Sequence, residues 1–77
     1  MNKKDELILL GARIKSARKA RRMSQTDLAF KIGKDQPSIN RVEKGNINPS
    51  YLYLLEIASG MQITLVELLS DEDARRK

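Results

Sequence analysis

Three side chains near the middle of the chain are of types that can recognise the edges of nucleic-acid bases. Gln36, Asn40 and Arg41 lie within the 22 residues from Ser24 to Gly45, SQTDLAFKIGKDQPSINRVEKG. A side-chain amide can pair with an adenine edge through two hydrogen bonds, and a guanidinium group can contact guanine or a phosphate in the same forked manner. These residue types therefore predict base recognition in a major groove, if the backbone presents them on one exposed face.

The first half of this segment is predicted to fold into a short helix that begins at Gln25. Ser24 and Asp27 have the spacing of a capping box, in which each side chain accepts a hydrogen bond from the other residue's backbone N–H. Apolar residues between Leu28 and Ile32 form one stripe for burial, and Gly33 supplies the left-handed conformation that ends many helices. This half therefore predicts a helix followed directly by a tight turn.

The second half is predicted to be another short helix, which Asp35 caps at its start. Pro37 is compatible with the first turn, because the amide groups there have no partner within the helix. Ile39 and Val42 give the helix a buried side, and Gly45 ends it. Two helices joined in this way, with polar residues on the outer face, are typical of helix–turn–helix units that bind DNA.

The rest of the chain is predicted to form three further helices and no strand. Apolar residues recur at helical spacing from Asp5 to Arg21, with acidic residues near the start and basic residues near the end, as the helix dipole favours. Ser50 is suited to cap a helix whose apolar residues continue to Met61, and Thr64 with Glu67 forms a second capping box before a short helix. The predicted fold class is therefore all-α, with five helices.

The length and the charge distribution narrow the function further. The chain has 77 residues, enough for one small domain. We expect residues 1–70 to form this domain and residues 71–77 to be a solvated charged tail. The net charge is +5; residues 1–22 carry eight basic and two acidic side chains, whereas residues 51–77 carry three basic and five acidic ones. A basic patch beside a helix–turn–helix favours a polyanionic partner.

The composition argues against an enzyme or a metal site. The sequence contains neither histidine nor cysteine, which excludes imidazole acid–base catalysis, cysteine nucleophiles and thiolate or imidazole metal ligands. The acidic run Asp71–Asp73 lacks the glycine-turned loop of a calcium site. The longest apolar run, Leu7–Leu10, is too short to span a membrane. We therefore expect no catalytic residue, metal, cofactor, small-molecule ligand or membrane contact.

The three aromatic residues do not favour binding of single strands, which uses aromatic platforms on a sheet or groove. Tyr51 falls in the apolar stripe of the fourth predicted helix and is expected in the core. Phe30 and Tyr53 fall outside the stripes of their helices, so we expect one of them at the surface or at an interface.

Several short motifs follow one another in a fixed order. They are Ser24-Gln25-x-x-Leu28-Ala29, then Gly33, then Ser38-Ile39-x-Arg41-Val42-Glu43-x-Gly45, and finally Asn48-Pro49-Ser50. Together, at this spacing, they resemble the phage-repressor and Cro-type helix–turn–helix domains of the Xre family, and the similarity extends from about Leu10 to Leu69. It implies a compact five-helix, lambda-repressor-like fold with the helix–turn–helix at helices two and three. It also implies transcriptional regulation through a near-palindromic double-stranded DNA operator.

The resemblance implies a role for each residue that matches the family motif. The helix from about Gln36 to Lys44 would enter the major groove as the recognition helix. The residues expected to contact bases are Gln36, Pro37, Asn40 and Arg41. The residues expected to contact phosphates are Ser24, Gln25, Ser38, Lys44, Asn46 and Asn48. Gln25 is expected to brace the recognition helix as well.

Two matched positions imply a structural role, and three positions depart from the family pattern. Arg18 and Glu43 are expected to form a largely buried ion pair between the first and third helices. Pro37 replaces a polar residue, which limits it to apolar contact with a thymine methyl group. Arg22 and Gln62 stand where the family has glycine, so each helix must end there in a left-handed conformation or in another way.

The fifth predicted helix is richer in apolar residues than one face of so short a helix can bury. The resemblance implies a symmetric homodimer through this end of the molecule, with recognition helices about 34 Å apart. The residues expected at the dimer interface are Met61, Ile63, Leu65, Val66 and Leu69.

One alternative from a different class stays open. Pro37 weakens base recognition, and it favours a protein-interaction module, such as an antitoxin or adaptor, whose DNA binding is secondary or lost. A phage repressor, a restriction–modification controller and a plasmid or transposon regulator fit the sequence equally well. In each case we expect a bacterial or phage-encoded protein in the cytoplasm, associated with the nucleoid.

Overall fold

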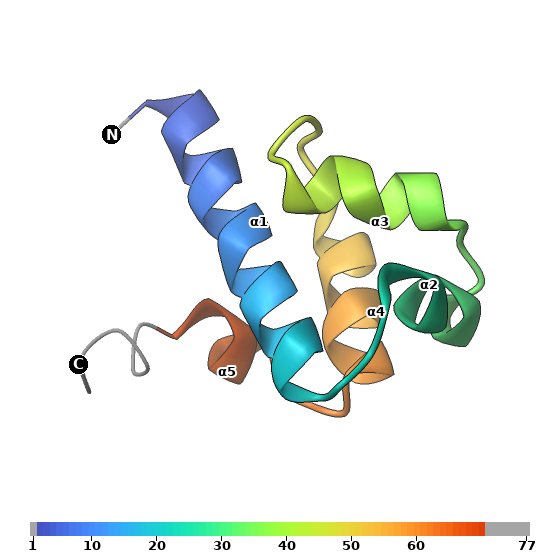
Figure 1. Cartoon of the computed structure of the whole chain (residues 1–77). Helices are drawn as coiled ribbons and strands as arrows, with labels where there is room; N and C mark the ends of the chain where they lie inside the picture. The colour runs from blue at the N-terminus through green and yellow to red at the C-terminus, as the bar shows by residue number, and fades with distance from the viewer. Residues whose placement is uncertain (1, 71–77) are drawn as a thin grey trace.

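The computed structural model describes residues 2–70 and shows that this part of the chain is all-α (Figure 1). The five helices are α1 (Lys3–Ala20), α2 (Gln25–Ile32), α3 (Gln36–Glu43), α4 (Tyr51–Gly60) and α5 (Leu65–Leu69). The predicted fold class is therefore confirmed. The expected charged tail, residues 71–77, lies outside the described residues.

Each helix begins at a polar side chain that accepts a hydrogen bond from a backbone N–H three residues later. The five caps are Asn2, Ser24, Asp35, Ser50 and Thr64, with bonds of 2.8–3.0 Å. Both predicted capping boxes are present, at the starts of α2 and α5. Because Asn2 caps α1, this helix begins two residues earlier than the sequence pattern predicts.

Helices α1 to α4 all end in the same way, with one residue of positive φ. The residue is glycine after α2 and α3, but it is Arg22 (φ 57°) after α1 and Gln62 (φ 61°) after α4. The next N–H in each case bonds back to the helix: that of Met23 to the Arg18 carbonyl (3.2 Å), and that of Ile63 to the Ala58 carbonyl (3.0 Å). These bonds complete the C-terminal cap and offset the cost of a left-handed side-chain-bearing residue, roughly 1–2 kcal/mol.

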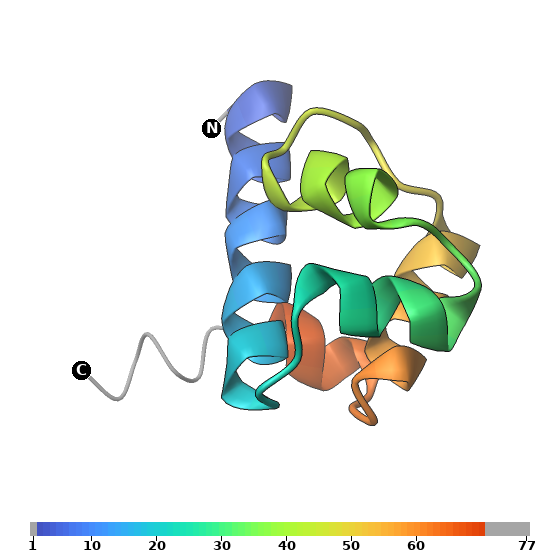
Figure 2. The same ribbon diagram turned by 45° about the vertical axis from the view of Figure 1, so that its right-hand side comes forward.

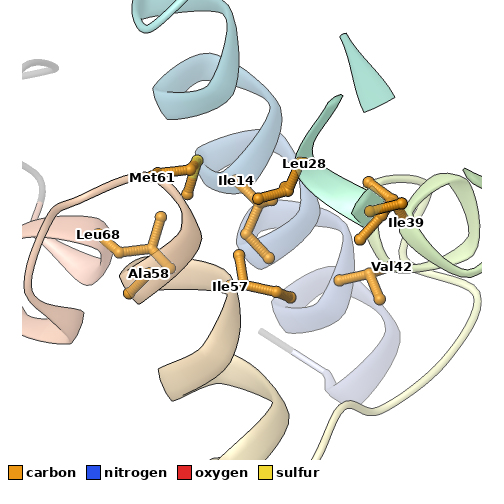
Figure 3. Packing of buried hydrophobic residues seen from close by; sticks show 9 residues of the cluster. Ile14, Leu28, Ile39, Val42, Ile57, Ala58, Met61 and Leu68 are labelled. Carbon is orange, nitrogen blue, oxygen red and sulfur yellow. The ribbon is translucent and has the colours of Figure 1, made fainter. Parts of the chain in front are cut away.

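All five helices contribute to one hydrophobic core. Fully buried apolar side chains from them meet at the centre of the molecule (Figure 3); the core consists of Ile14, Leu28, Ala29, Ile39, Val42, Ile57, Ala58, Met61 and Leu68. Met61 is only 1% exposed, so the prediction that it belongs to a dimer interface is wrong. The expectation that Tyr51 is buried is also wrong, since it is 65% exposed.

Helix α3 is held from two directions, and its third side is exposed. It packs against α1 and α2; in Figure 2, α2 lies below it and α1 stands beside it. Gly11 makes the α1 contact possible, because a Cβ atom there would lie only 2.3 Å from the backbone oxygen of Glu43. The two supporting helices therefore fix both the position and the rotation of α3 about its axis.

Candidate nucleic-acid interface

The two faces of α3 differ sharply in burial. Its inner face, Ile39, Val42 and Glu43, is buried against α1 and α2. Its outer face carries the four side chains expected to contact bases: Gln36, Pro37 and Arg41 are exposed, and Asn40 is half-buried. The structure therefore presents all four on the accessible side of one helix.

A buried ion pair joins this helix to α1. Arg18 Nε lies 2.7 Å from Glu43 Oε2, and Arg18 Nη2 lies 3.0 Å from Glu43 Oε1; the two side chains are only 7% and 2% exposed. Arg18 Nη1 also donates to the carbonyl of Met23 at 2.7 Å. The hydrogen bond to Glu43 raises the pKa of Arg18 above its ordinary value, although burial acts in the opposite direction. Arg18 thus acts in the scaffold and is not available to DNA.

The amide of Gln25 connects this ion pair to the outer face of α3. Its Nε2 donates to Glu43 Oε1 (2.9 Å) and to Asn40 Oδ1 (3.3 Å), and its Oε1 accepts from Gln36 Nε2 (2.6 Å). Both N–H groups of this amide are therefore engaged within the protein. Gln25 braces two residues of the outer face, and its side chain has no donor left for a phosphate.

A separate hydrogen bond orients Arg41, another of the side chains expected to contact bases. Arg41 Nη2 donates to the hydroxyl of Ser38, 3.2 Å away and three residues earlier in α3. Asp35 caps the same turn; its hydrogen bonds with Ser38 lower the pKa of its carboxyl group below the ordinary value. The guanidinium group thus lies along the outer face of the helix, with its other N–H groups available.

Most of the residues expected to contact phosphates lie at two places beside α3. Ser24 is exposed at the start of α2, where it caps the helix. Lys44, Asn46 and Asn48 are exposed around the loop between α3 and α4. Ser38, on α3 itself, is half-buried. The backbone turns sharply between α3 and α4, where Gly45 has a φ of 75°.

The structure adds a basic segment that the motif analysis did not assign to the site. A Cβ atom at Gly45 would lie 2.9 Å from the Cα of Ile8, so the α3–α4 loop packs on the first turns of α1. Lys3 and Lys4 are exposed in the first turn of this helix. The amino end of α1 lies on the same side of the molecule as the α3–α4 loop (Figure 1). The concentration of basic residues in residues 1–22 is the signal in the sequence that points to them.

The residues expected at a dimer interface lie around α5, at another end of the molecule. Val66 is 80% exposed and Leu69 is 39% exposed. Ile63 and Leu65 are half-buried, and both line a shallow groove between α4 and α5. Apart from Met61, which is in the core, the residues expected there are thus all at least partly exposed.

Comparison with known proteins identifies the family. A helix-turn-helix family model matches residues 14–68, which is most of the chain. The chain belongs to this helix-turn-helix family. It is 37% identical over 68 residues to the control protein C.MunI from Mycoplasma sp, a match that covers 87% of this chain and 92% of that protein.

Solved structures agree with this assignment. The restriction-modification controller protein C.AhdI from Aeromonas hydrophila superposes with a TM-score of 0.85 at 32% sequence identity, covering 90% of this chain and all of that one. A hypothetical transcription factor, NHTF from Neisseria, shares the fold with a TM-score of 0.82 at 20% identity, covering 100% of this chain and 91% of that one. The resemblance read from the sequence motifs is thus confirmed.

Family membership establishes the general function, sequence-specific DNA binding in the regulation of transcription. The family consists of DNA-binding regulators and not of enzymes. Within residues 2–70, no three or more carboxylate side chains come together where they could hold a metal ion. No helix in the same part of the chain has the length and apolar character to cross a bilayer.

Proposed function

We propose that residues 1–70 act as one DNA-binding domain and that the chain binds a near-palindromic operator as a symmetric homodimer. Helix α3 would enter the major groove with its outer face toward the bases. The observation that carries this proposal is the outer face itself: Gln36 and Asn40 are anchored through Gln25 to a buried ion pair. Side chains fixed before binding lose less conformational entropy on contact with DNA, and they favour one arrangement of base contacts.

The base contacts follow from the chemistry of each side chain. Gln36 retains a free oxygen and one free N–H, the pattern that pairs with adenine. Arg41 matches the two acceptors of guanine, and Pro37 can contact a thymine methyl group. Asn40, between them along the helix, offers its Nδ2 group.

Phosphate contacts would position the helix in the groove. Since the Gln25 side chain is fully engaged, we assign its phosphate contact to its backbone N–H, together with that of Thr26, at the start of α2. The positive end of the helix dipole favours an anion at this place. Side chains around α3 would complete the set: Ser24, Ser38, Lys44, Asn46 and Asn48.

The dimer would form through the groove between α4 and α5. Val66, Leu69, Ile63 and Leu65 supply an apolar surface that a second copy can cover. Two-fold symmetry would then place the two recognition helices about 34 Å apart, one turn of DNA.

The relatives support a more specific role. C.AhdI is described as a restriction-modification controller and C.MunI as a control protein, and both are more than 30% identical to this chain over most of their length. We therefore propose that this chain controls transcription of restriction–modification genes. Binding to such genes would place it on DNA in the bacterial cytoplasm.

Selection of bound duplexes from a random DNA pool, read by sequencing, tests the proposal. The expected result is a motif with two-fold symmetry and half-sites one helical turn apart, which also occurs upstream of restriction–modification genes. Affinity should fall steeply with salt, because phosphate contacts release counterions. If folded protein enriches no sequence, the operator proposal is wrong, and the protein-interaction module becomes the better explanation.

A further inference from the structure

We propose that Glu43 determines which hydrogen-bonding groups of Gln36 and Asn40 face the DNA, although Glu43 itself does not face it. Glu43 would be a positioning residue for base specificity, acting through Gln25. This inference rests on the proposed function, since it requires that Gln36 and Asn40 contact bases. It goes beyond a bracing role, because it predicts the identity of the preferred bases and how to change them.

The first step is the contact between Glu43 and Gln25. Arg18 donates two hydrogen bonds to Glu43, one to each oxygen, and the glutamate side chain is only 2% exposed. A carboxylate paired with a guanidinium group can only accept hydrogen bonds. The atom of Gln25 that lies 2.9 Å from Glu43 Oε1 must therefore be its amide nitrogen.

The second step passes this orientation to the outer face. With its nitrogen toward Glu43, Gln25 donates its other N–H to Asn40, which must turn its oxygen inward (3.3 Å). The oxygen of Gln25 then faces Gln36, which must turn its nitrogen inward (2.6 Å). Flipping any one of these amides would place two donors or two acceptors against each other.

The third step concerns the hydrogen-bonding groups of Asn40 and Gln36 that remain available to DNA. Asn40 has its Nδ2 group available as a donor, which suits bases that present acceptors in the major groove, above all guanine and thymine. Gln36 has its oxygen and one N–H available, which suits adenine. The charge of a buried residue thus sets the preference at two base pairs.

Glu43→Gln should invert the orientation of the whole chain of amides. The new amide would keep its oxygen on Arg18 Nε, the shorter of the two contacts (2.7 Å) and the group with a single N–H. Its nitrogen would take the place of Oε1 and face Gln25, at the loss of the hydrogen bond from Arg18 Nη2. Gln25, Asn40 and Gln36 would each flip as a result. Asn40 would then present an acceptor, which suits cytosine or adenine, and Gln36 would present only donors, which suits guanine.

Gln25→Lys should invert the orientation of the Gln36 amide alone, and it leaves the buried ion pair intact. An ammonium group has donors only. It would donate to Glu43 and Asn40 as the native amide does, but Gln36 would now have to turn its oxygen inward. The preference at the Gln36 base pair should change from adenine to guanine, while the preference at the Asn40 base pair stays the same. Phe30→Lys adds the same charge at an 86% exposed residue of the same helix, which is given no DNA contact, and is the matched control.

The experiment compares base preferences of these variants by selection from a random duplex pool. Titrations of duplexes that differ at one base pair then measure each change. Gln36→Ala and Asn40→Ala first identify the base pair that each residue reads. We expect the ratio of affinities for the old and new base to change by roughly tenfold or more in Gln25→Lys, and not in Phe30→Lys.

The outcomes separate this inference from the proposed function. If the wild-type protein selects no motif, the proposed function is wrong, and the inference with it. If the wild type selects a motif and Gln25→Lys keeps the adenine preference, the inference alone is wrong. Glu43→Gln provides the second test when it folds: a change at both positions supports the relay, and uniformly weaker binding to the same motif overturns it.

Discussion

The helix–turn–helix end and the α4–α5 end of the molecule expose opposite kinds of surface. At the first end, polar side chains of α3 are fixed by a continuous series of hydrogen bonds that begins at a buried ion pair. At the second, Val66 and Leu69 are exposed and apolar. A polar surface with fixed donors and acceptors suits a partner with a hydrogen-bonding code, whereas an apolar surface suits another apolar surface.

The two surfaces also differ in what makes their contacts specific. Apolar contact is non-directional, so the α4–α5 surface needs only area and shape. Hydrogen bonds to bases are directional, so the helix–turn–helix surface needs side chains with one orientation. Under the proposed relay, the ion pair behind α3 supplies this orientation, although apolar residues of similar volume are often as stable or more so at buried positions.

Removing one partner of the ion pair should have the largest effect on stability. Arg18→Ala leaves Glu43 buried without its cation, which we expect to cost roughly 3–5 kcal/mol of the free energy of unfolding. Urea denaturation measures this loss, with the exposed neighbour Lys19→Ala as the control. A loss no greater than that of the control would show that the pair is not important for folding.

A charge on the apolar surface should separate the proposed dimer without unfolding the protomer. Val66→Glu places a carboxylate on a side chain that is 80% exposed, so the thermal midpoint of the monomer should change little. Light scattering should show a monomer, and operator affinity should fall roughly 100-fold or more, because the second half-site no longer benefits from linkage. Phe30→Glu, at an 86% exposed residue of α2, is the matched control and should remain dimeric. A dimer in Val66→Glu would place the interface elsewhere.

The sequence predicted the polar end better than the apolar end, for a physical reason. Caps and turns are local, so Ser24, Asp35 and Gly33 could each be interpreted from a few neighbours. The fourth helix, YLYLLEIASG, is apolar on nearly every side, so its periodicity does not indicate which face is buried. Tyr51 and Met61 were therefore assigned to the wrong environments.

Contacts between distant segments were not accessible to pattern analysis. The full engagement of Gln25 depends on where α3 lies relative to α2, which local spacing does not determine. Gly11 carries a weaker signal of such a contact. Glycine within a helix costs about 1 kcal/mol relative to alanine, and its presence indicates a close approach of backbone.

Truncation of the guanidinium group on the outer face should affect DNA binding and not stability. Arg41 is exposed, and its hydrogen bond to Ser38 lies on the helix surface. We expect Arg41→Ala to lower operator affinity by about 1–3 kcal/mol and to relax the preference at one base pair. Competition titrations with single-substituted duplexes measure both. An equal loss on all sequences would make Arg41 a phosphate contact.

The smallest expected effect concerns acid, and it acts on the start of the recognition helix. Hydrogen bonds with Ser38 lower the pKa of Asp35 in the folded protein. Its contribution to stability is therefore complete above the unfolded value, about 3.9, and is lost as the pH falls through the lower folded value. Asn caps helices about as well as Asp but does not titrate, so Asp35→Asn should match the wild type at pH 7 and lose less stability between about pH 4 and 2. Urea titrations across this range measure the difference. Helix α4, at the other end of the molecule, begins at Ser50, whose hydroxyl does not titrate in this range. If Asp35→Asn loses as much stability in acid as the wild type, the Asp35 cap does not make the start of α3 sensitive to acid.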